Sequence, residues 1–392
     1  MPNKDRNIPK RRFKAFENAD AWELRKLGEV ATSFDYGLNS AATEYDGENK
    51  YLRITDIDDD SRGFNISDLT SPEIDLFGLD EYRLNIGDIV FARTGASVGK
   101  SYIYRSIDGK VYFAGFLIRA KIKDNFNPDF VFQNTLTANY ERFISITSMR
   151  SGQPGVNAQE YSNYEFMVPS HPEQKAIGTF FSTLDQQITL HQRKLDKLKH
   201  VKQAYLSEMF PAEGERMPKR RFPGFTDAWE LRKLKLLFIF KYGDGNNNPS
   251  NGGPYPVFGA GGVQGGYTEY NSENSIIIGH MGDAGCVSWG EGKHFVTYNG
   301  TITRPKEEVF TAKFGYYLLS KMNLRQYRGG SGLPFLTYDM LNDMDTIVPT
   351  TKSECDKISE FFSTLDQQIT LHQRKLEKLK NLKKALLNEL FV

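Results

Sequence analysis

The chain has 392 residues, and its 50 Lys and Arg nearly balance its 49 Asp and Glu, giving a formal net charge of +1. This length provides for two or three domains, each with its own core. A near-neutral balance excludes a uniformly basic nucleic-acid-binding protein, so any surface that faces DNA must be a local patch.

The sequence carries no targeting or metal-binding signal. Cys286 and Cys355 have neither the spacing of a zinc site nor that of a disulfide framework. The charged segment 1–16 lacks the apolar core of a signal peptide, and the longest apolar run in the middle of the chain, 234–240, is too short to cross a bilayer. We therefore expect a cytoplasmic protein without a metal site and without membrane contact.

Two leading segments share one sequence. PKRRFKAFENADAWELRKL at 9–27 is matched by PKRRFPGFTDAWELRKL at 218–234. Each segment contains a basic cluster, at 10–12 or 219–221, which we expect to be solvated, to face phosphate or to contact a partner subunit.

A long helix pattern also occurs twice. FFSTLDQQITLHQRKL stands at 180–195 and again, unchanged, at 361–376. Alternating spacings of four and three residues form a heptad seam, typical of a coiled coil, in which we read the two histidines as polar seam residues rather than metal ligands. About 38 residues make a rod of roughly 57 Å. The seam residues are Leu184, Ile188, His191, Leu195, Leu198, Tyr205 and Met209, and then Leu365, Ile369, His372, Leu376, Leu379, Leu386 and Leu390.

These repeats predict the order domain, helix, domain, helix, with bounds 1–172, 173–211, 212–352 and 353–392. If the second domain has its termini close together, the second helix returns along the first. The predicted fold class is α/β, with two globular domains separated by two long antiparallel coiled-coil helices and a pseudo-twofold internal repeat. A simple duplication, in which the repeated segments serve folding alone, also explains the pattern. Near-identical helices with diverged domains are, however, expected if the helices form one symmetric framework and the two domains recognise different targets.

Matching turns occur inside the two diverged domains. DIVFARTGASVG at 88–99 resembles SIIIGHMGDAG at 275–285, and SGQPGVN at 151–157 resembles SGLPFLT at 331–337. Basic and small polar side chains at such turns are those that contact phosphates and base edges. Each turn equally fits a plain connection between strands.

We select DNA-binding candidates from these turns and from polar or aromatic positions near them. In the first domain they are Tyr36, Asn39, Ser40, Arg53, Arg93, Thr94, Lys100, Arg150, Ser151, Gln153 and Asn157. In the second domain they are Tyr255, His280, Tyr298, Asn299, Arg304, Arg325, Arg328, Ser331 and Phe335.

No motif predicts a catalytic residue. NPDF at 127–130 lacks the second proline of a methyltransferase motif and fits a helix start. TGASVGKS at 94–101 is one residue short of a phosphate loop and precedes a strand-like segment rather than a helix. GAGGVQGG at 259–266 fits a tight glycine loop, packed alone or against a DNA backbone. Glu173 begins a helix, which does not fit a nuclease motif.

Together, several of these segments resemble the specificity (S) subunit of type I restriction-modification systems. The resemblance covers essentially the whole chain, and it rests on the WELRKL segments, GDIVFARTGASVGK, SGQPGVN, VPSHPEQKAIGTFFSTLDQQI, PYPVFGAGGVQGGY and GGSGLPFLT. It implies two target recognition domains that bind double-stranded DNA at a bipartite site with an unspecified spacer, and no catalytic residue or cofactor on this chain.

The resemblance also implies partners. Two modification subunits with S-adenosylmethionine would dock on the leading segments and helices and methylate adenine. Where present, two restriction subunits would use ATP and Mg. Because DNA has local twofold symmetry, two unlike domains would read two half-sites in opposite orientation.

The alternative is a non-catalytic protein-interaction scaffold with two globular heads on a coiled coil. Sequence-specific retention on DNA in the presence of a methyltransferase partner distinguishes the two hypotheses.

Overall fold

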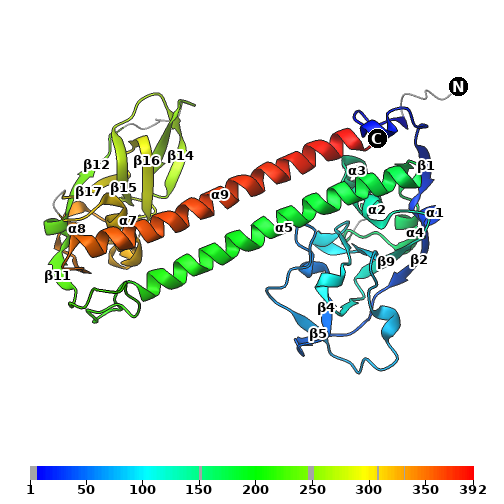
Figure 1. Ribbon diagram of the computed structural model, residues 1–392, viewed down its shortest axis with the longest axis horizontal. Helices are drawn as coiled ribbons and strands as arrows, with labels where there is room; N and C mark the ends of the chain where they lie inside the picture. Colours follow the sequence, from blue (N-terminus) through cyan, green and yellow to red (C-terminus); the bar gives the residue numbers. More distant parts are fainter. Residues whose placement is uncertain (1–6, 150–151, 246–250, 307–308, 331) are drawn as a thin grey trace. The chain divides into compact units, whose positions relative to one another are not determined.

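The computed structural model describes residues 7–149, 152–245, 251–306, 309–330 and 332–392 (Figure 1). The chain divides into two compact units, which we consider separately. Unit 1 comprises Met1–Arg193 with Gln373–Val392, and unit 2 comprises Lys194–His372. Each unit therefore contains part of both long helices, α5 (His171–Glu208) and α9 (Lys352–Leu390).

The main sheet of unit 1 is antiparallel and has the strand order β2-β9-β6-β7, with the bounds Ala31–Tyr36, Leu117–Ile122, Ile89–Ala92 and Ser101–Ile103. All of β6 is buried, as its apolar sequence requires. Two small ladders flank this sheet: antiparallel β3 and β5 (Ala42–Glu44, Thr70–Pro72) and parallel β4 and β8 (Lys50–Leu52, Val111–Phe113).

Three short helices complete the first domain, namely α2 (Pro128–Asn134), α3 (Ala138–Thr147) and α4 (Ala158–Ser162). The NPDF motif starts α2, as we predicted. The Asn127 side chain accepts a hydrogen bond from the Phe130 amide (2.9 Å), and proline occupies the first turn. The TGASVGK segment forms a single turn between β6 and β7, so a strand follows it rather than the helix that a phosphate loop needs.

The sheet of unit 2 has the strand order β12-β17-β15-β16-β13-β14, with the bounds Phe238–Tyr242, Gly300–Pro305, Ser272–Gly279, Val287–Val296, Tyr255–Gly259 and Gly262–Tyr267. All pairs are antiparallel except β13 with β16. Helices α7 (Ala312–Lys321) and α8 (Tyr338–Asp343) belong to the same unit.

The glycine-rich segment of unit 2 is a hairpin of β13 and β14 rather than the loop that we expected. Its glycines allow a close approach between backbones. A Cβ on Gly266 would lie 2.4 Å from the Gly253 carbonyl oxygen, and the Gly266 carbonyl accepts hydrogen bonds from the Asn251 and Gly252 amides (2.9 and 3.1 Å). Close packing within the chain thus accounts for Gly266, and the positive φ of Gly262 (110°) accounts for the glycine at the start of β14.

The leading segments build the same ribbon twice. Strand β1 (Glu23–Lys26) pairs with β10 (Glu165–Val168), and β11 (Glu230–Lys233) pairs with β18 (Asp345–Val348) in the matching register. A one-turn helix follows each ribbon strand, α1 (Leu27–Val30) or α6 (Leu234–Leu237). Trp22 and Trp229, which precede the ribbons, are buried. The sequence repeat is therefore a structural repeat.

The basic clusters of the leading segments are not simply solvated, and our expectation was wrong for the second arginine of each. Arg12 forms two hydrogen bonds of 2.6 Å with Glu173, and Arg221 forms bonds of 2.6 and 2.8 Å with Glu354. The side chains of Glu173 and Glu354 are each only 1% exposed. Each pair thus attaches a leading segment to the first turn of the long helix in the same unit.

The two long helices pair in antiparallel fashion within each unit. In unit 1, Phe181 lies 5.8 Å from Phe391 between ring centroids, and Asp185 forms an ion pair of 2.6 Å with Lys383. Residue numbers therefore rise along α5 as they fall along α9 (Figure 1). The expected antiparallel arrangement is confirmed within this unit.

The ion pair recurs in unit 2 with the helices exchanged. Lys202 of α5 lies 2.6 Å from Asp366 of α9, and Tyr205 packs against Phe361 at 5.0 Å between centroids. Asp366 repeats Asp185, and Lys202 repeats Lys383. The same contact made in reciprocal order by two copies of one sequence is the signature of pseudo-twofold symmetry.

All of the predicted seam residues are buried or half-buried. Leu184, Ile188, Leu195, Met209, Leu376, Leu386 and Leu390 are buried, and His191, Leu198, Tyr205, Leu365, Ile369, His372 and Leu379 are half-buried.

We predict that Glu354→Ala destabilises the chain far more than Glu230→Ala. Loss of Glu354 leaves Arg221 buried without its carboxylate, which costs about 3–5 kcal/mol. Glu230 forms an exposed pair with Arg232, and such pairs contribute at most about 1 kcal/mol. Urea unfolding of the full chain, followed by circular dichroism, measures both. Equal shifts of the unfolding midpoint would refute the structural role of the buried pair.

We also predict that unit 2 loses stability in mild acid. His294 is fully buried, its Nε2 lies 2.9 Å from the Ser275 hydroxyl, and burial lowers its pKa below the ordinary 6.5. As the pH falls below 6.5, the unfolded chain takes up a proton that the folded chain resists, so the free energy of unfolding decreases. Measured from pH 7 to pH 5, this decrease should be smaller in His294→Gln; an unchanged slope would contradict the assignment.

Candidate nucleic-acid interface

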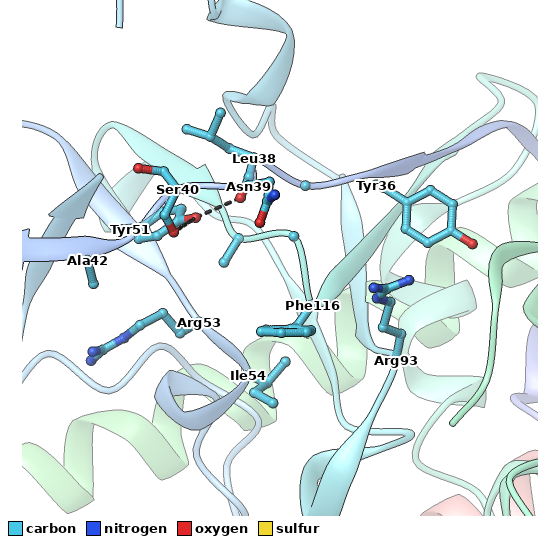
Figure 2. Close-up of a pocket in the computed structure, with 13 residues that line it drawn as sticks. Tyr36, Leu38, Asn39, Ser40, Ala42, Tyr51, Arg53, Ile54, Arg93 and Phe116 are labelled. Atoms are coloured by element: carbon cyan, nitrogen blue, oxygen red, sulfur yellow. Dashed lines mark hydrogen bonds between the residues drawn. The ribbon is translucent and has the colours of Figure 1, made fainter. Parts of the chain in front are cut away.

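In unit 1, three side chains converge at one edge of the main sheet. Tyr36 ends β2, Arg93 directly follows β6, and Phe116 directly precedes β9. The register pairs Tyr36 with Ile118 and Ala92 with Leu117, so these strand ends are neighbours. We call Tyr36, Arg93 and Phe116 the first edge cluster (Figure 2).

Arg93 lies between the two aromatic rings of this cluster. Its guanidinium carbon is 5.1 Å from the Tyr36 centroid and 5.8 Å from the Phe116 centroid, within the range of cation–π attraction. Its backbone is held by hydrogen bonds to the Phe116 carbonyl (3.0 Å) and from the Val156 amide (2.9 Å). Tyr36 and Phe116 are 44% and 57% exposed, so the cluster faces solvent.

The first edge cluster borders a cavity of about 480 Å³, which Asn39, Ser40 and Arg53 also line (Figure 2). The Tyr51 hydroxyl donates to the Leu38 carbonyl (2.7 Å) and fixes the wall of this cavity. Arg53 is already neutralised, because it forms two hydrogen bonds with Asp56 that raise the pKa of Arg53. Of the arginines that line the cavity, Arg93 is therefore the cation left for a ligand.

Unit 2 has an equivalent cluster at the same sheet edge. Tyr242 ends β12, His280 directly follows β15, and Asn299 directly precedes β17. The Tyr242 and His280 rings lie 4.3 Å apart, and Tyr338 lies 4.9 Å from Tyr242. Burial raises the pKa of Tyr242. We call Tyr242, His280 and Asn299 the second edge cluster.

The two clusters share one backbone frame. His280 donates to the Asn299 carbonyl (2.7 Å) and accepts from the Leu336 amide (2.8 Å), which repeats the two bonds of Arg93. The glycine after each cluster tyrosine is also sterically required. A Cβ on Gly37 would lie 2.2 Å from the Ala114 carbonyl oxygen, and one on Gly243 would lie 2.3 Å from that of Thr297. Positions 93 and 280 are thus structurally equivalent.

The clusters include some sequence candidates and omit others. Tyr36, Asn39, Ser40, Arg53 and Arg93 surround one cavity, and His280 and Asn299 stand together in unit 2. The backbone segments next to the clusters carry Thr94, Gln153, Tyr298 and Phe335, while Arg328 is exposed nearby in sequence. Arg150, Ser151 and Ser331 lie outside the described residues.

Other candidates have contacts within the chain. Lys100 forms an ion pair of 2.6 Å with Asp59 and lines a different cavity. The Asn157 side chain caps α4, and Arg304 donates a hydrogen bond to Ser272. Arg325 forms an ion pair with Asp283, and the Tyr255 ring contacts the Tyr270 ring. These side chains, which we expected to contact DNA, thus have interaction partners within the chain.

Sequence reasoning missed Phe116 and Tyr242. The signal for Tyr242 was present, since FDYG at 34–37 recurs as FKYG at 240–243. Phe116 had no such repeat, because its counterpart is Asn299. The position of Phe116 is apparent only from the pairing of β9 with β6.

The described residues offer little for metal or membrane chemistry. In the described part of the chain, no group of three His, Cys, Asp or Glu is placed to hold a metal ion. Of the described helices, none combines the length and the apolar character needed to cross a membrane.

Comparison with known families identifies the class of protein. The type I restriction modification DNA specificity domain matches residues 19–200 and again 226–381, one match in each half. The matches cover most of the chain, which therefore belongs to this family of non-catalytic specificity subunits of type I restriction-modification systems.

One solved structure shares the fold over nearly the whole chain. A type I restriction-modification S subunit from M. genitalium matches with a TM-score of 0.76 and 16% identity, over 98% of this chain and 99% of that chain. A structure described as the assembly and conformational transition of a type I system has 16% identity and a TM-score of 0.45, covering 94% and 96% of the two chains. The HsdS subunit from Thermoanaerobacter tengcongensis has 17% identity and a TM-score of 0.39, covering 96% and 99%.

We predict that Gly243→Ala disturbs the second edge cluster, whereas Gly245→Ala does not. A Cβ at 243 meets backbone oxygens at 2.3 Å, but one at 245 meets nothing within 4 Å. Such overpacking costs about 1–3 kcal/mol. Thermal unfolding of the two variants measures the difference. Equal melting temperatures would show that the backbone around Gly243 accommodates a Cβ and would contradict the prediction.

Proposed function

We propose that this chain is the sequence-specific DNA-binding subunit that directs adenine methylation, and restriction where a nuclease subunit is present, to a bipartite asymmetric target with an unread spacer. The observation that carries this proposal is the pair of edge clusters. One backbone frame presents different side chains in the two units, Arg93 and Phe116 in one and His280 and Asn299 in the other. Two equivalent frames with unlike side chains suit two half-sites of unlike sequence.

The spacer follows from the helices. Helices α5 and α9 are uninterrupted over 38 and 39 residues, and each passes from one unit into the other. A helix of this length spans roughly 57 Å, against about 34 Å for one turn of DNA. Base pairs between the two half-sites would therefore remain unread.

The leading segments supply docking surfaces for two modification subunits, which would carry S-adenosylmethionine. Strands β1 and β11 are exposed along most of their length, and Leu24 and Leu231 at matching positions are 54% and 52% exposed. The same apolar side chain offered twice suits two copies of one partner. Restriction subunits would bring ATP and Mg to the assembled complex.

The alternative of a protein-interaction scaffold explains the edge clusters less well. A protein partner would meet Arg93 with a carboxylate, but nothing in the repeat requires the equivalent position to change to histidine. Base-edge recognition does require such a change whenever the two half-sites differ.

The test is a methylome. The chain is expressed with its cognate modification subunit in a host that lacks adenine methylation, and modified adenines are mapped by single-molecule sequencing. We expect one motif made of two short, unlike half-sites around a fixed gap. A soluble complex that leaves adenine unmodified would overturn the proposal, and so would methylation at a continuous motif.

A further inference from the structure

The guanidinium of Arg93 lacks the acidic partner that most buried or half-buried arginines of unit 1 have; Arg62, which lines the separate cavity of Lys100, shares this property. Arg53 is paired with Asp56, Arg105 with Asp129, and Arg119 with Asp35. Among the residues that the structure describes, Arg93 forms no ion pair, and its side chain donates no hydrogen bond. The terminal amino groups of Arg93 therefore have no acceptor within the described chain and are left to bond to water or to a ligand.

The surroundings of Arg93 restrict how such an acceptor can approach. The Nε atom is buried without a partner, so a ligand meets the terminal amino groups. The Tyr36 and Phe116 rings flank the guanidinium, and backbone bonds to Phe116 and from Val156 fix the residue at the strand end. A planar fork that is held in place loses little conformational freedom when it binds.

A guanidinium fork matches a particular base edge. In the major groove, guanine presents two adjacent acceptors, O6 and N7, to which arginine binds in bidentate fashion. Phosphate can also accept two hydrogen bonds from arginine. A phosphate contact is independent of base sequence, however, so we would expect a permanently charged residue at the equivalent position in unit 2. It carries His280 on the same backbone bonds instead.

We propose that Arg93 is a specificity-determining residue that reads a guanine in the half-site of the first domain. The inference rests on the proposed function. It assigns a chemical class of ligand to the first edge cluster, namely a G·C pair whose guanine faces Arg93, and it assigns the opposite half-site to the cluster around His280.

The experiment compares the methylomes of four complexes: wild type, Arg93→Ala, Arg93→Lys and His280→Ala. We expect Arg93→Ala to relax one G·C position of one half-site by roughly 10-fold to 100-fold, with the other half-site unchanged. Arg93→Lys keeps the charge and the packing stem but not the fork, so it should relax the same position. His280→Ala is the matched control and should alter only the other half-site.

Three outcomes would contradict the inference. If Arg93→Lys retains wild-type specificity while Arg93→Ala lowers methylation equally at all sites, Arg93 contacts phosphate. If the wild-type half-site that His280→Ala leaves unchanged contains no G·C pair, the guanine assignment is wrong although the proposed function stands. If both Arg93 variants methylate the wild-type motif normally, Arg93 reads nothing. Absence of methylation by the wild type would instead defeat the proposed function itself.

Discussion

The antiparallel pairing of α5 with α9 is the constraint on which the rest of the structure depends. Each helix belongs to both units, and one Asp–Lys contact occurs in each unit with the roles of the helices exchanged. The pairing also brings the end of each helix to a leading segment. Phe391 packs on Trp22 in unit 1, and Phe210 packs on Trp229 in unit 2. The end of α9 therefore packs on the first leading segment, and the end of α5 packs on the second.

This arrangement gives both units the same foundation. A buried Arg–Glu pair fixes each leading segment to the start of a helix, and an exposed ribbon follows it. A one-turn helix then leads from the ribbon into the sheet. On that foundation the sheets differ in strand order, yet the edge that carries Arg93 or His280 keeps its backbone bonds. The fold thus keeps the backbone of the two edge clusters while the side chains there change.

The sequence predicted the elements whose pattern is local or repeated. The heptads of 180–195 and 361–376 and the duplicated WELRKL predicted the helices and the twofold organisation, because both signals need no knowledge of tertiary contacts. The prediction from sequence was wrong for Arg12, which we expected to be solvated because it belongs to a basic cluster. Its partner Glu173 lies 161 residues away, and only the folded chain brings them together.

The same limit applied to the edge clusters. Arg93 and His280 were found from a matching glycine turn, but their aromatic frame depends on which strands are neighbours, and a single sequence does not reveal strand order. Lys100 shows the converse error. It stands in the same turn as Arg93, yet the strand reverses direction and places it against Asp59 instead.

The proposed function requires that two equivalent units read two half-sites through one twofold frame. The most direct measurement is the methylome of a chain in which 9–179 replaces 218–360, so that both joints fall within repeated sequence. We expect methylation at an inverted repeat of the first half-site, with the wild-type gap. A direct repeat of that half-site, or persistence of the original asymmetric motif, would contradict it.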